Sequence, residues 1–230
     1  MDLKPIEVAK NGAADFLREM EAELESGRID EGEWYRRVAE FITPKYLAAG
    51  TPWGQSGRSG DAGSWEVARG LIIDAVDRAG SFLDVGCASG YLMECLVRWG
   101  RGKGIELEPY GLDIAPELAE LARGRLPGWR ERIFVGNAME WEPPRRFDFV
   151  RTGLEYVPVR RQRDLVRRLL DRVVGPGGRL IVGVFNEEVD GRATEELVRS
   201  WGLAIAGRTE RPHGTDPRLV YRVIWIDRHR

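Results

Sequence analysis

Cysteine and histidine are scarce in this sequence, which has two of each among its 230 residues. Cys87 and Cys95 lie eight positions apart, and both His213 and His229 are distant from them along the chain. A zinc site draws several ligands from these residue types, and a disulfide framework needs several cysteine pairs. We therefore expect neither kind of site, and we expect no bound metal.

Long apolar runs are also missing. The longest, Leu180–Phe185 and Val223–Ile226, are far shorter than the roughly 20 residues that a membrane-spanning helix needs. The first ten residues carry charges of both signs and contain no apolar stretch followed by a small-residue cleavage site, so we see no export signal. A soluble protein in the cytoplasm is the expectation that follows.

An excess of charge of one sign is the third absence. The sequence has 35 basic and 37 acidic residues, and its formal net charge is -2. Only four of the basic residues are lysines, and no segment gathers enough cations to follow a phosphate backbone. This balance disfavours nucleic acid as a partner.

The sequence does contain enough apolar material for one α/β domain with an appendage. Hydrophobic residues make up 43% of the chain and charged residues 31%, which supports a packed core and excludes disorder. Residues 12–27 and 31–49 place apolar side chains at helical spacing, and residues 50–63 carry a glycine at every third or fourth position. We expect two amphipathic helices and then a flexible loop, so that residues 1–64 form an N-terminal helical cap or lid.

Beyond residue 80, short apolar runs alternate with helical periods, which is typical of a sheet wound with crossover helices. The strands are expected near 82–85, 110–114, 132–135, 147–151, 180–184, 203–208 and 219–226, and the helices near 89–99, 116–125, 160–174 and 192–201. No helix fits between the last two strands, so they should pair as a hairpin with the final strand antiparallel. Residues 65–230 thus form a seven-stranded, mostly parallel α/β domain flanked by helices.

The most informative stretch runs from Phe82 to Leu92, where an apolar strand leads through small residues into a helix. Gly86, Ala88 and Gly90 have no side chain larger than a methyl group, so a ligand can approach the backbone closely and meet free N–H donors at the helix start. Asp84, near the end of the strand, is well placed to hold a polar or cationic part of that ligand. The alternative is an ordinary tight turn in which the same residues allow close packing.

Two later strand ends add polar groups to the same edge of the sheet. Asp113 follows Gly90 by 23 residues at the end of the second strand, where a carboxylate can accept both hydroxyls of a ribose. After the third strand, Asn137 can hydrogen-bond an adenine edge, while Ala138 and Met139 supply backbone polar groups and an apolar cover. Together the three segments predict nucleoside binding, although each of them alone also suits an ordinary strand-end turn.

The order and spacing of these segments resemble the class I S-adenosylmethionine-dependent methyltransferases over roughly residues 65–228. The stretch 84–90 is similar to the family's first motif, with Ala88 where a glycine is usual, and Asp113 is similar to its ribose-binding acid. Asn137 and Ala138 resemble the adenine-contacting turn, in which aspartate is commoner than asparagine, and residues 169–180 resemble the helix end and Pro-Gly-Gly turn before the fifth strand. The resemblance implies the strand order 3-2-1-4-5-7-6, with strand 7 antiparallel, and S-adenosylmethionine as the cofactor, with S-adenosylhomocysteine as its product.

The expected cofactor-binding residues follow from these motifs and from the resemblance. They are Asp84, Gly86, Cys87, Ala88, Ser89, Gly90, Tyr91, Asp113, Ile114, Asn137, Ala138, Met139, Thr152 and Gly153. From the glycine-rich loop we expect contacts by Gln55, Ser56, Arg58 and Ser59, with Arg58 paired to the methionine carboxylate or to an acidic acceptor. Most of the aromatic side chains between residues 34 and 65 are expected in the core, and the others could line an acceptor pocket.

Methyl transfer from a sulfonium depends mainly on alignment and desolvation, so a general base is optional. The candidates for one are Glu155 and Tyr156 after the fourth strand, and His213 in the hairpin loop. Methylators of nucleic acids and protein amines in this family often carry Asn or Asp, two prolines and an aromatic residue after the fourth strand, and residues 151–154 have no such pattern. Together with the charge balance, this favours a small-molecule acceptor.

Two other functions stay open at this point. A nicotinamide-dependent oxidoreductase on a Rossmann sheet would carry G-x-G-x-x-G, whereas the stretch from Gly86 to Gly90 is one residue short of that pattern. A methyltransferase-like scaffold that binds S-adenosylmethionine or a partner without catalysis is compatible with all of these residues. The sequence specifies neither the acceptor nor the atom methylated, and it allows either a monomer or a homodimer.

Overall fold

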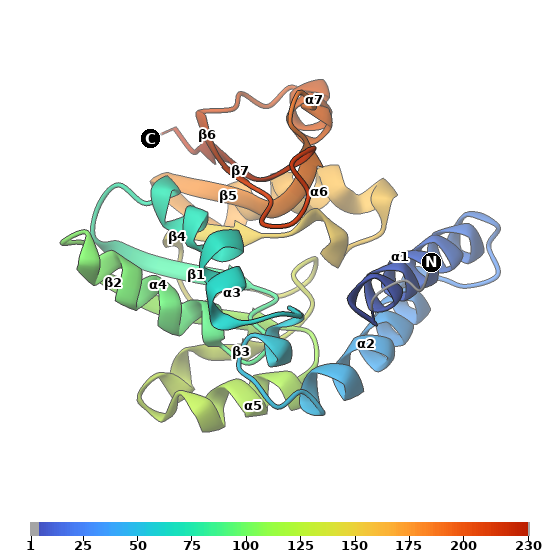
Figure 1. Cartoon of the computed structure of the whole chain (residues 1–230). Helices are drawn as coiled ribbons and strands as arrows, with labels where there is room; N and C mark the ends of the chain where they lie inside the picture. Colours follow the sequence, from blue (N-terminus) through green and yellow to red (C-terminus); the bar gives the residue numbers. More distant parts are fainter. Residues whose placement is uncertain (1–4, 230) are drawn as a thin grey trace.

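A central sheet of seven strands organises the chain in the computed structural model, which describes residues 5–229, with side chains from residue 12 onward. The strands are β1 (Gly80–Val85), β2 (Leu107–Asp113), β3 (Ile133–Val135), β4 (Phe147–Thr152), β5 (Val174–Glu188), β6 (Gly207–Pro212) and β7 (Leu219–Asp227). Their order is β3-β2-β1-β4-β5-β7-β6, and β7 runs antiparallel to both of its neighbours while the other pairs are parallel (Figure 1). The predicted fold class and strand order are confirmed.

Helices cover both faces of this sheet (Figure 1). They are α1 (Pro5–Glu25), α2 (Glu31–Leu47), α3 (Ala62–Arg69), α4 (Tyr91–Gly102), α5 (Pro116–Arg125), α6 (Gln162–Arg168) and α7 (Ala193–Ser200). On one face, Phe82 packs in a core with Leu71 and with Leu96 of α4, and on the other, Leu83 packs with Leu165 of α6. Adjacent residues of β1 are thus buried on opposite faces, which explains why Phe82 and Leu83 are both apolar.

Strand β6 begins later than expected. The sequence suggested a strand at 203–208, but pairing with β7 runs from Gly207 opposite Trp225 to Pro212 opposite Val220. Leu203 and Ile205 instead pack against the core outside any strand. The prediction followed apolar residues, whereas the paired segment lies at the sheet edge, where alternate side chains face solvent.

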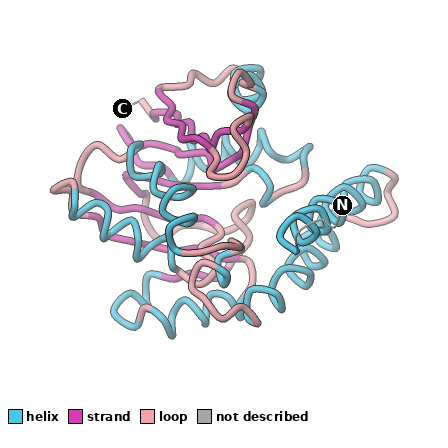
Figure 2. Tube along the Cα trace, in the orientation of Figure 1, coloured by secondary structure: helices cyan, strands magenta, loops and turns pink. Residues whose placement is uncertain are grey.

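The first two helices form a hairpin that stands beside the body of the molecule (Figure 2). Asp30 caps α2 by accepting the backbone N–H of Glu33 at 2.8 Å. Phe16 of α1 stacks on Phe41 of α2 with ring centroids 3.9 Å apart, and Trp34 is buried in the small core between the helices. The two predicted helices are therefore present, although residues 1–4, which belong to the segment expected to lack an export signal, lie outside the described residues.

The glycine-rich stretch that follows was expected to be a flexible loop, and part of it is regular. A single 3-10 turn spans Gly54–Ser56, and α3 begins at Ala62 behind a capping box formed by Asp61 and Ser64. The indole N–H of Trp53 donates to the carbonyl of Gly60 at 2.8 Å and closes the loop on itself. Among residues 5–229, no helix is long and apolar enough to cross a membrane.

Candidate functional site

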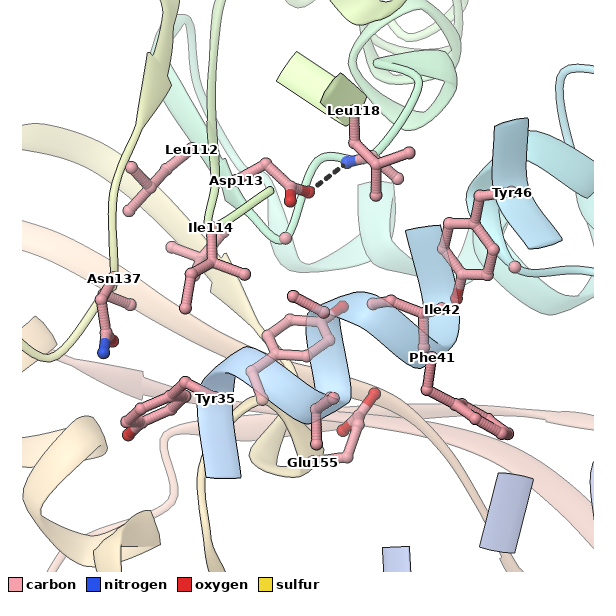
Figure 3. A pocket seen from close by; sticks show the side chains of 18 of the residues that line it. Tyr35, Phe41, Ile42, Tyr46, Leu112, Asp113, Ile114, Leu118, Asn137 and Glu155 are labelled. Atoms are coloured by element: carbon pink, nitrogen blue, oxygen red, sulfur yellow. Dashed lines mark hydrogen bonds between the residues drawn. The ribbon is translucent and has the colours of Figure 1, made fainter. Parts of the chain in front are cut away.

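A cavity of about 320 Å³ lies between the helical hairpin and the carboxyl ends of β1 and β2. Figure 3 shows Tyr35, Phe41 and Tyr46 of α2 on one side of it, with Asp113 and Ile114 at the end of β2 opposite. The glycine-rich turn after β1 and the turn after β4 complete its walls. Ligands of open α/β sheets bind beyond the carboxyl ends of the strands, so this cavity is where the fold itself predicts a site.

The turn after β1 is shaped by three residues with positive φ angles: Gly86 (74°), Ala88 (46°) and Gly90 (73°). Asp113 is only 6% exposed and holds this turn, because one of its carboxylate oxygens accepts the backbone N–H of Ala88 at 2.8 Å. The other oxygen accepts the N–H of Ala115 at 3.0 Å. Burial raises the pKa of Asp113, and these backbone hydrogen bonds partly oppose that rise.

The Asp84 carboxylate forms an ion pair with an arginine of the neighbouring strand. Arg151 lies opposite Asp84 in the register between β1 and β4, and its Nη1 is 3.2 Å from the carboxylate. The same nitrogen donates to the hydroxyl of Tyr156 at 2.8 Å, and Nε donates to the carbonyl of Gly183 at 2.6 Å. Burial raises the pKa of Asp84 to about 6, although Arg151 acts in the opposite direction. Asp84 is thus already paired within the chain and does not line the cavity, and its direct contact with a ligand stays a prediction.

Arg69, the last residue of α3, is a cation in the cavity wall, and Glu155 is the acid of the same wall that interacts with it electrostatically. Its guanidinium lies over the ring of Trp65, 5.7 Å from the centroid, and has no hydrogen-bond or ion-pair partner among the described residues. Burial lowers its pKa, and the nearby charge of Arg151 lowers it further. A cation in this environment favours an anionic group of a ligand.

Several predicted residues do meet at the cavity. The lining includes Ser56, Gly86, Ala88, Asp113, Ile114, Asn137, Ala138, Glu155 and Tyr156. Asn137 accepts the backbone N–H of Met139 at 3.0 Å through its side-chain oxygen. Tyr46 also lines the cavity and packs against the cluster that contains Ala88, so α2 reaches over the glycine-rich turn.

Other predicted residues lie outside the cavity wall. The side chain of Cys87 is buried toward Gly111, Gly90 packs against Leu126, and Tyr91 packs on Trp65. The hydroxyl of Ser89 is hydrogen-bonded to that of Ser56 at 2.8 Å. Thr152 is buried in β4, and neither Gly153 nor Met139 reaches the lining, so these residues support the turns rather than face the cavity.

The two candidates near the C-terminal hairpin are directed elsewhere. Arg58 donates to the hydroxyl of Tyr221 at 2.7 Å and stacks on that ring, so it is engaged with β7 and not with the cavity. His213 also packs on Tyr221, with ring centroids 4.7 Å apart, and is absent from the lining as well. Gln55 and Ser59 do not line the cavity either.

Sequence reasoning missed the two arginines, Arg69 and Arg151. Arg69 lies in the helix that precedes the first strand, and a basic residue in its last turn was the available signal. Arg151 was mentioned only because residues 151–154 lack the pattern that methylators of nucleic acids and protein amines often carry after the fourth strand. Of the helical aromatic residues, Trp34, Tyr35, Phe41 and Tyr46 line the cavity, whereas Trp53 and Trp65 do not.

Comparisons with known proteins agree with this architecture. Residues 82–178 match the model of a family described as a methyltransferase domain. The structure is similar to the 1,6-didemethyltoxoflavin-N1-methyltransferase of Burkholderia thailandensis, solved with 1,6-didemethyltoxoflavin and S-adenosylhomocysteine (TM-score 0.64, 19% identity, covering 88% of this chain and 92% of that one). It is also similar to the N-methyltransferase NodS of Bradyrhizobium japonicum in complex with S-adenosylhomocysteine (0.60, 15%, 83% and 98%) and to the [4+2]-cyclase SpnF (0.56, 17%, 75% and 84%). No curated protein matches the sequence significantly. At these identities the structural likeness concerns the fold.

Proposed function

We propose that this chain, which carries a class I S-adenosylmethionine-dependent methyltransferase domain, transfers a methyl group from that cofactor to a small-molecule acceptor. The observation that carries the proposal is a cavity whose wall holds both a ribose-type acid, Asp113, and a cation, Arg69, that has no hydrogen-bond or ion-pair partner among the described residues. A nucleoside with an amino-acid tail has a diol and a carboxylate to meet these two groups. A dinucleotide would instead bring a pyrophosphate to a glycine turn that is one residue short of its usual pattern.

The residues present fit the parts of S-adenosylmethionine. Each oxygen of Asp113 accepts one backbone N–H and keeps a lone pair for a ribose hydroxyl. The side-chain oxygen of Asn137 accepts the N–H of Met139, and its NH₂ group, which lies near the Tyr35 hydroxyl, would donate to a ring nitrogen of adenine. Ile114 and Ala138 supply apolar contacts for the base. Arg69 would pair with the methionine carboxylate, the role that the sequence suggested for Arg58.

Methyl transfer requires the protein mainly to align the acceptor with the methyl group. S-adenosylmethionine, when bound, supplies a methyl group on a sulfonium whose leaving group is a neutral thioether. Holding two reactants in near-attack geometry can be worth an effective molarity on the order of 10⁵ M or more. Val38, Phe41 and Ile42 of α2 line the cavity and would exclude water from it. Glu155 is the lining carboxylate that the cofactor does not use, so it is the group to take a proton from an acceptor that releases one.

The hairpin of α1 and α2 is proposed to act as a lid. Its residues line the cavity opposite the strand ends, so a ligand would be enclosed between the hairpin and the sheet. Part of its attachment is polar and exposed: Glu21 accepts the N–H of Val159 at 3.3 Å, and Arg160 lies 3.0 Å from Glu31. Exposed contacts of this kind contribute only about 1 kcal/mol or less each, which allows the hairpin to open.

A small acceptor is supported by the enclosure of the site and by its sequence. Apolar side chains of the hairpin form one wall of the cavity opposite the strand ends, and its volume of about 320 Å³ suits a small molecule. The turn after β4 has no Asn-Pro-Pro-aromatic pattern of the kind used on amines of nucleic acids and proteins. One structural neighbour was solved with a small heterocyclic molecule bound, which agrees with this reading.

The proposal is tested by titrating the purified protein with S-adenosylmethionine and, separately, with NADH in a calorimeter. We expect the first to bind and the second not to bind. Arg69→Met should weaken S-adenosylmethionine binding about tenfold to a hundredfold, because a charge-assisted hydrogen bond is worth about 1.5–3 kcal/mol. Arg58→Met is the matched comparison, since it removes an arginine that contacts Tyr221, and it should change affinity less than twofold.

Other results would contradict the proposal at defined points. Binding of NADH in preference to S-adenosylmethionine would favour an oxidoreductase. Tight binding of S-adenosylmethionine without release of S-adenosylhomocysteine in the presence of a broad panel of small acceptors would favour a scaffold, or a different reaction on the same fold. The second outcome is a real option, because a cyclase is among the proteins of similar structure.

A further inference from the structure

A second hollow of about 460 Å³ lies beside the first, between α1 and the segment 157–162. Leu17, Trp34 and Glu155 line both hollows, so the two spaces meet at these three side chains. The second hollow offers room for an acceptor next to a ligand in the first. Glu155, which Figure 3 shows in the wall of the first cavity, also lines the second.

Unpaired acids surround this second hollow. Glu21, Glu25 and Glu155 line it, and none of the three forms an ion pair with a basic side chain among the described residues. This contrasts with the rest of the chain, in which arginines pair with most of the acids nearby. Arg18 is the one basic residue among the described lining, and its guanidinium is bound to Asp15. Arg69 and Arg151 interact electrostatically with Glu155 from the side of the first cavity, so the excess of negative charge in the second hollow is greatest at Glu21 and Glu25.

The environment of Glu21 shows the same imbalance. Burial raises the pKa of Glu21, and Glu25 raises it further, while the N–H of Val159 and the charge of Arg160 act in the opposite direction. Arg160 is itself engaged with Glu31, at 3.0 Å. A ligand cation in the hollow would therefore relieve a repulsion that Val159 and Arg160 only partly offset.

The rest of the wall is apolar and aromatic. Trp34 is 1% exposed, and Leu17 and Val157 lie beside it. A cation near the carboxylates is stabilised by them, and the apolar side chains suit an uncharged body. The hollow is therefore complementary to a molecule with an apolar body and a positively charged end.

We infer that the methyl acceptor is an amine, protonated in solution, that occupies the second hollow and presents its nitrogen at Glu155. The inference rests on the proposed function and adds the chemical class of the acceptor to it. The ammonium first gives one proton, through the Glu155 carboxylate, to water. The nitrogen lone pair then forms the new N–C bond while the C–S bond of the donor breaks, and the sulfur keeps that electron pair. The product is an N-methylammonium and a neutral thioether.

Three probes with the same phenylethyl body test the inference: 2-phenylethylamine, 2-phenylethanol and 3-phenylpropanoate. The full chain is first saturated with S-adenosylhomocysteine, whose own binding is recorded, and each probe is then titrated by calorimetry. We expect the ammonium to bind at least tenfold more tightly than the alcohol or the carboxylate. Glu155→Gln and Glu21→Gln should each weaken ammonium binding several-fold, and Glu19→Gln, an exposed change on α1 outside both hollows, should not.

The outcomes separate this inference from the function on which it rests. If S-adenosylhomocysteine does not bind, the proposed function fails and the inference fails with it. If S-adenosylhomocysteine binds but the alcohol or carboxylate binds as well as the ammonium, or no probe binds, only the amine acceptor is overturned. Equal effects of Glu19→Gln and Glu155→Gln on ammonium binding would also overturn it. The preference for the ammonium would then come from the general negative charge of the surface and not from the hollow. Thermal unfolding of each variant checks that the fold is retained.

Discussion

Among single residues, Ala88 has the least common backbone conformation in the site. Its φ of 46° lies in the left-handed region, which costs an alanine roughly 1–2 kcal/mol and a glycine very little. The N–H that Asp113 accepts belongs to this residue. The hydrogen bond and the packing around the turn therefore maintain a conformation that the side chain disfavours.

An alanine-to-glycine change usually destabilises a folded protein, but at position 88 we expect the opposite effect. We expect Ala88→Gly to leave the free energy of unfolding unchanged or to raise it by up to about 1 kcal/mol, because the strain is removed. Ala119→Gly, at a buried position within α5, should lower it by about 1 kcal/mol or more. Urea denaturation of both variants measures the contrast. A loss of stability in Ala88→Gly equal to that in Ala119→Gly would show that the turn is not strained.

The charged residues of the site mark how far sequence reasoning could reach. Asp113 could be predicted because a carboxylate at the end of the second strand lies at a fixed distance from the glycine turn. The pairing of Asp84 with Arg151 could not, because the two are 67 positions apart and meet only through the register of β1 and β4. Arg58 was chosen because it lies in a glycine-rich loop, but Tyr221 offers it a hydrogen bond and a ring that only the folded chain brings near.

Among the elements, β5, β6 and β7 are tied together by one buried arginine. Arg222 of β7 is fully buried; it pairs with Glu187 of β5 and, at 2.9 Å, with Glu210 of β6. It also donates to the carbonyl of Gly191 at 2.6 Å. The antiparallel part of the sheet therefore contains a buried charge that depends on partners from three segments.

We predict that Arg222→Met destabilises the chain by about 3 kcal/mol, because removal of one partner leaves Glu187, itself largely buried, without a countercharge. Arg218→Met is the control: this arginine is exposed and pairs with Asp216 in the hairpin loop, so its loss should cost about 0.5 kcal/mol or less. Denaturant titrations of the two variants test the difference. Similar costs for both would mean that the buried cluster contributes no more than a surface pair.

The elements were predicted best where burial makes a continuous pattern. β1, β2 and β4 were placed within a few residues, because strands buried on both faces are rich in apolar residues. β6 was displaced toward Leu203, because an edge strand of alternating polar residues has no such pattern. The 3-10 turn at Gly54–Ser56 could not be foreseen from composition, since its geometry depends on contacts within the loop and with Ser89.

At the scale of the whole molecule, the helical hairpin and the sheet enclose the cavity between them. If the hairpin is a lid, a bound ligand should hold it closed. We predict that saturation with S-adenosylhomocysteine slows amide hydrogen exchange in α2 at least tenfold, because the ligand would contact both α2 and the strand ends. Exchange in α7, which does not line the cavity, should not change. Binding of the ligand with unaltered exchange in α2 would contradict the lid.

The two margins of the sheet have a consequence for how the chain behaves at high concentration. At one margin β3 is only 3 residues long, and at the other β6 exposes Arg208, Glu210 and Pro212 along its free side. A neighbouring molecule that tried to add a strand would find too few groups at the first margin, and charges and a missing N–H at the second. Fibre-like growth by strand addition is thus blocked at both ends, and the protein can be concentrated without that route to aggregation.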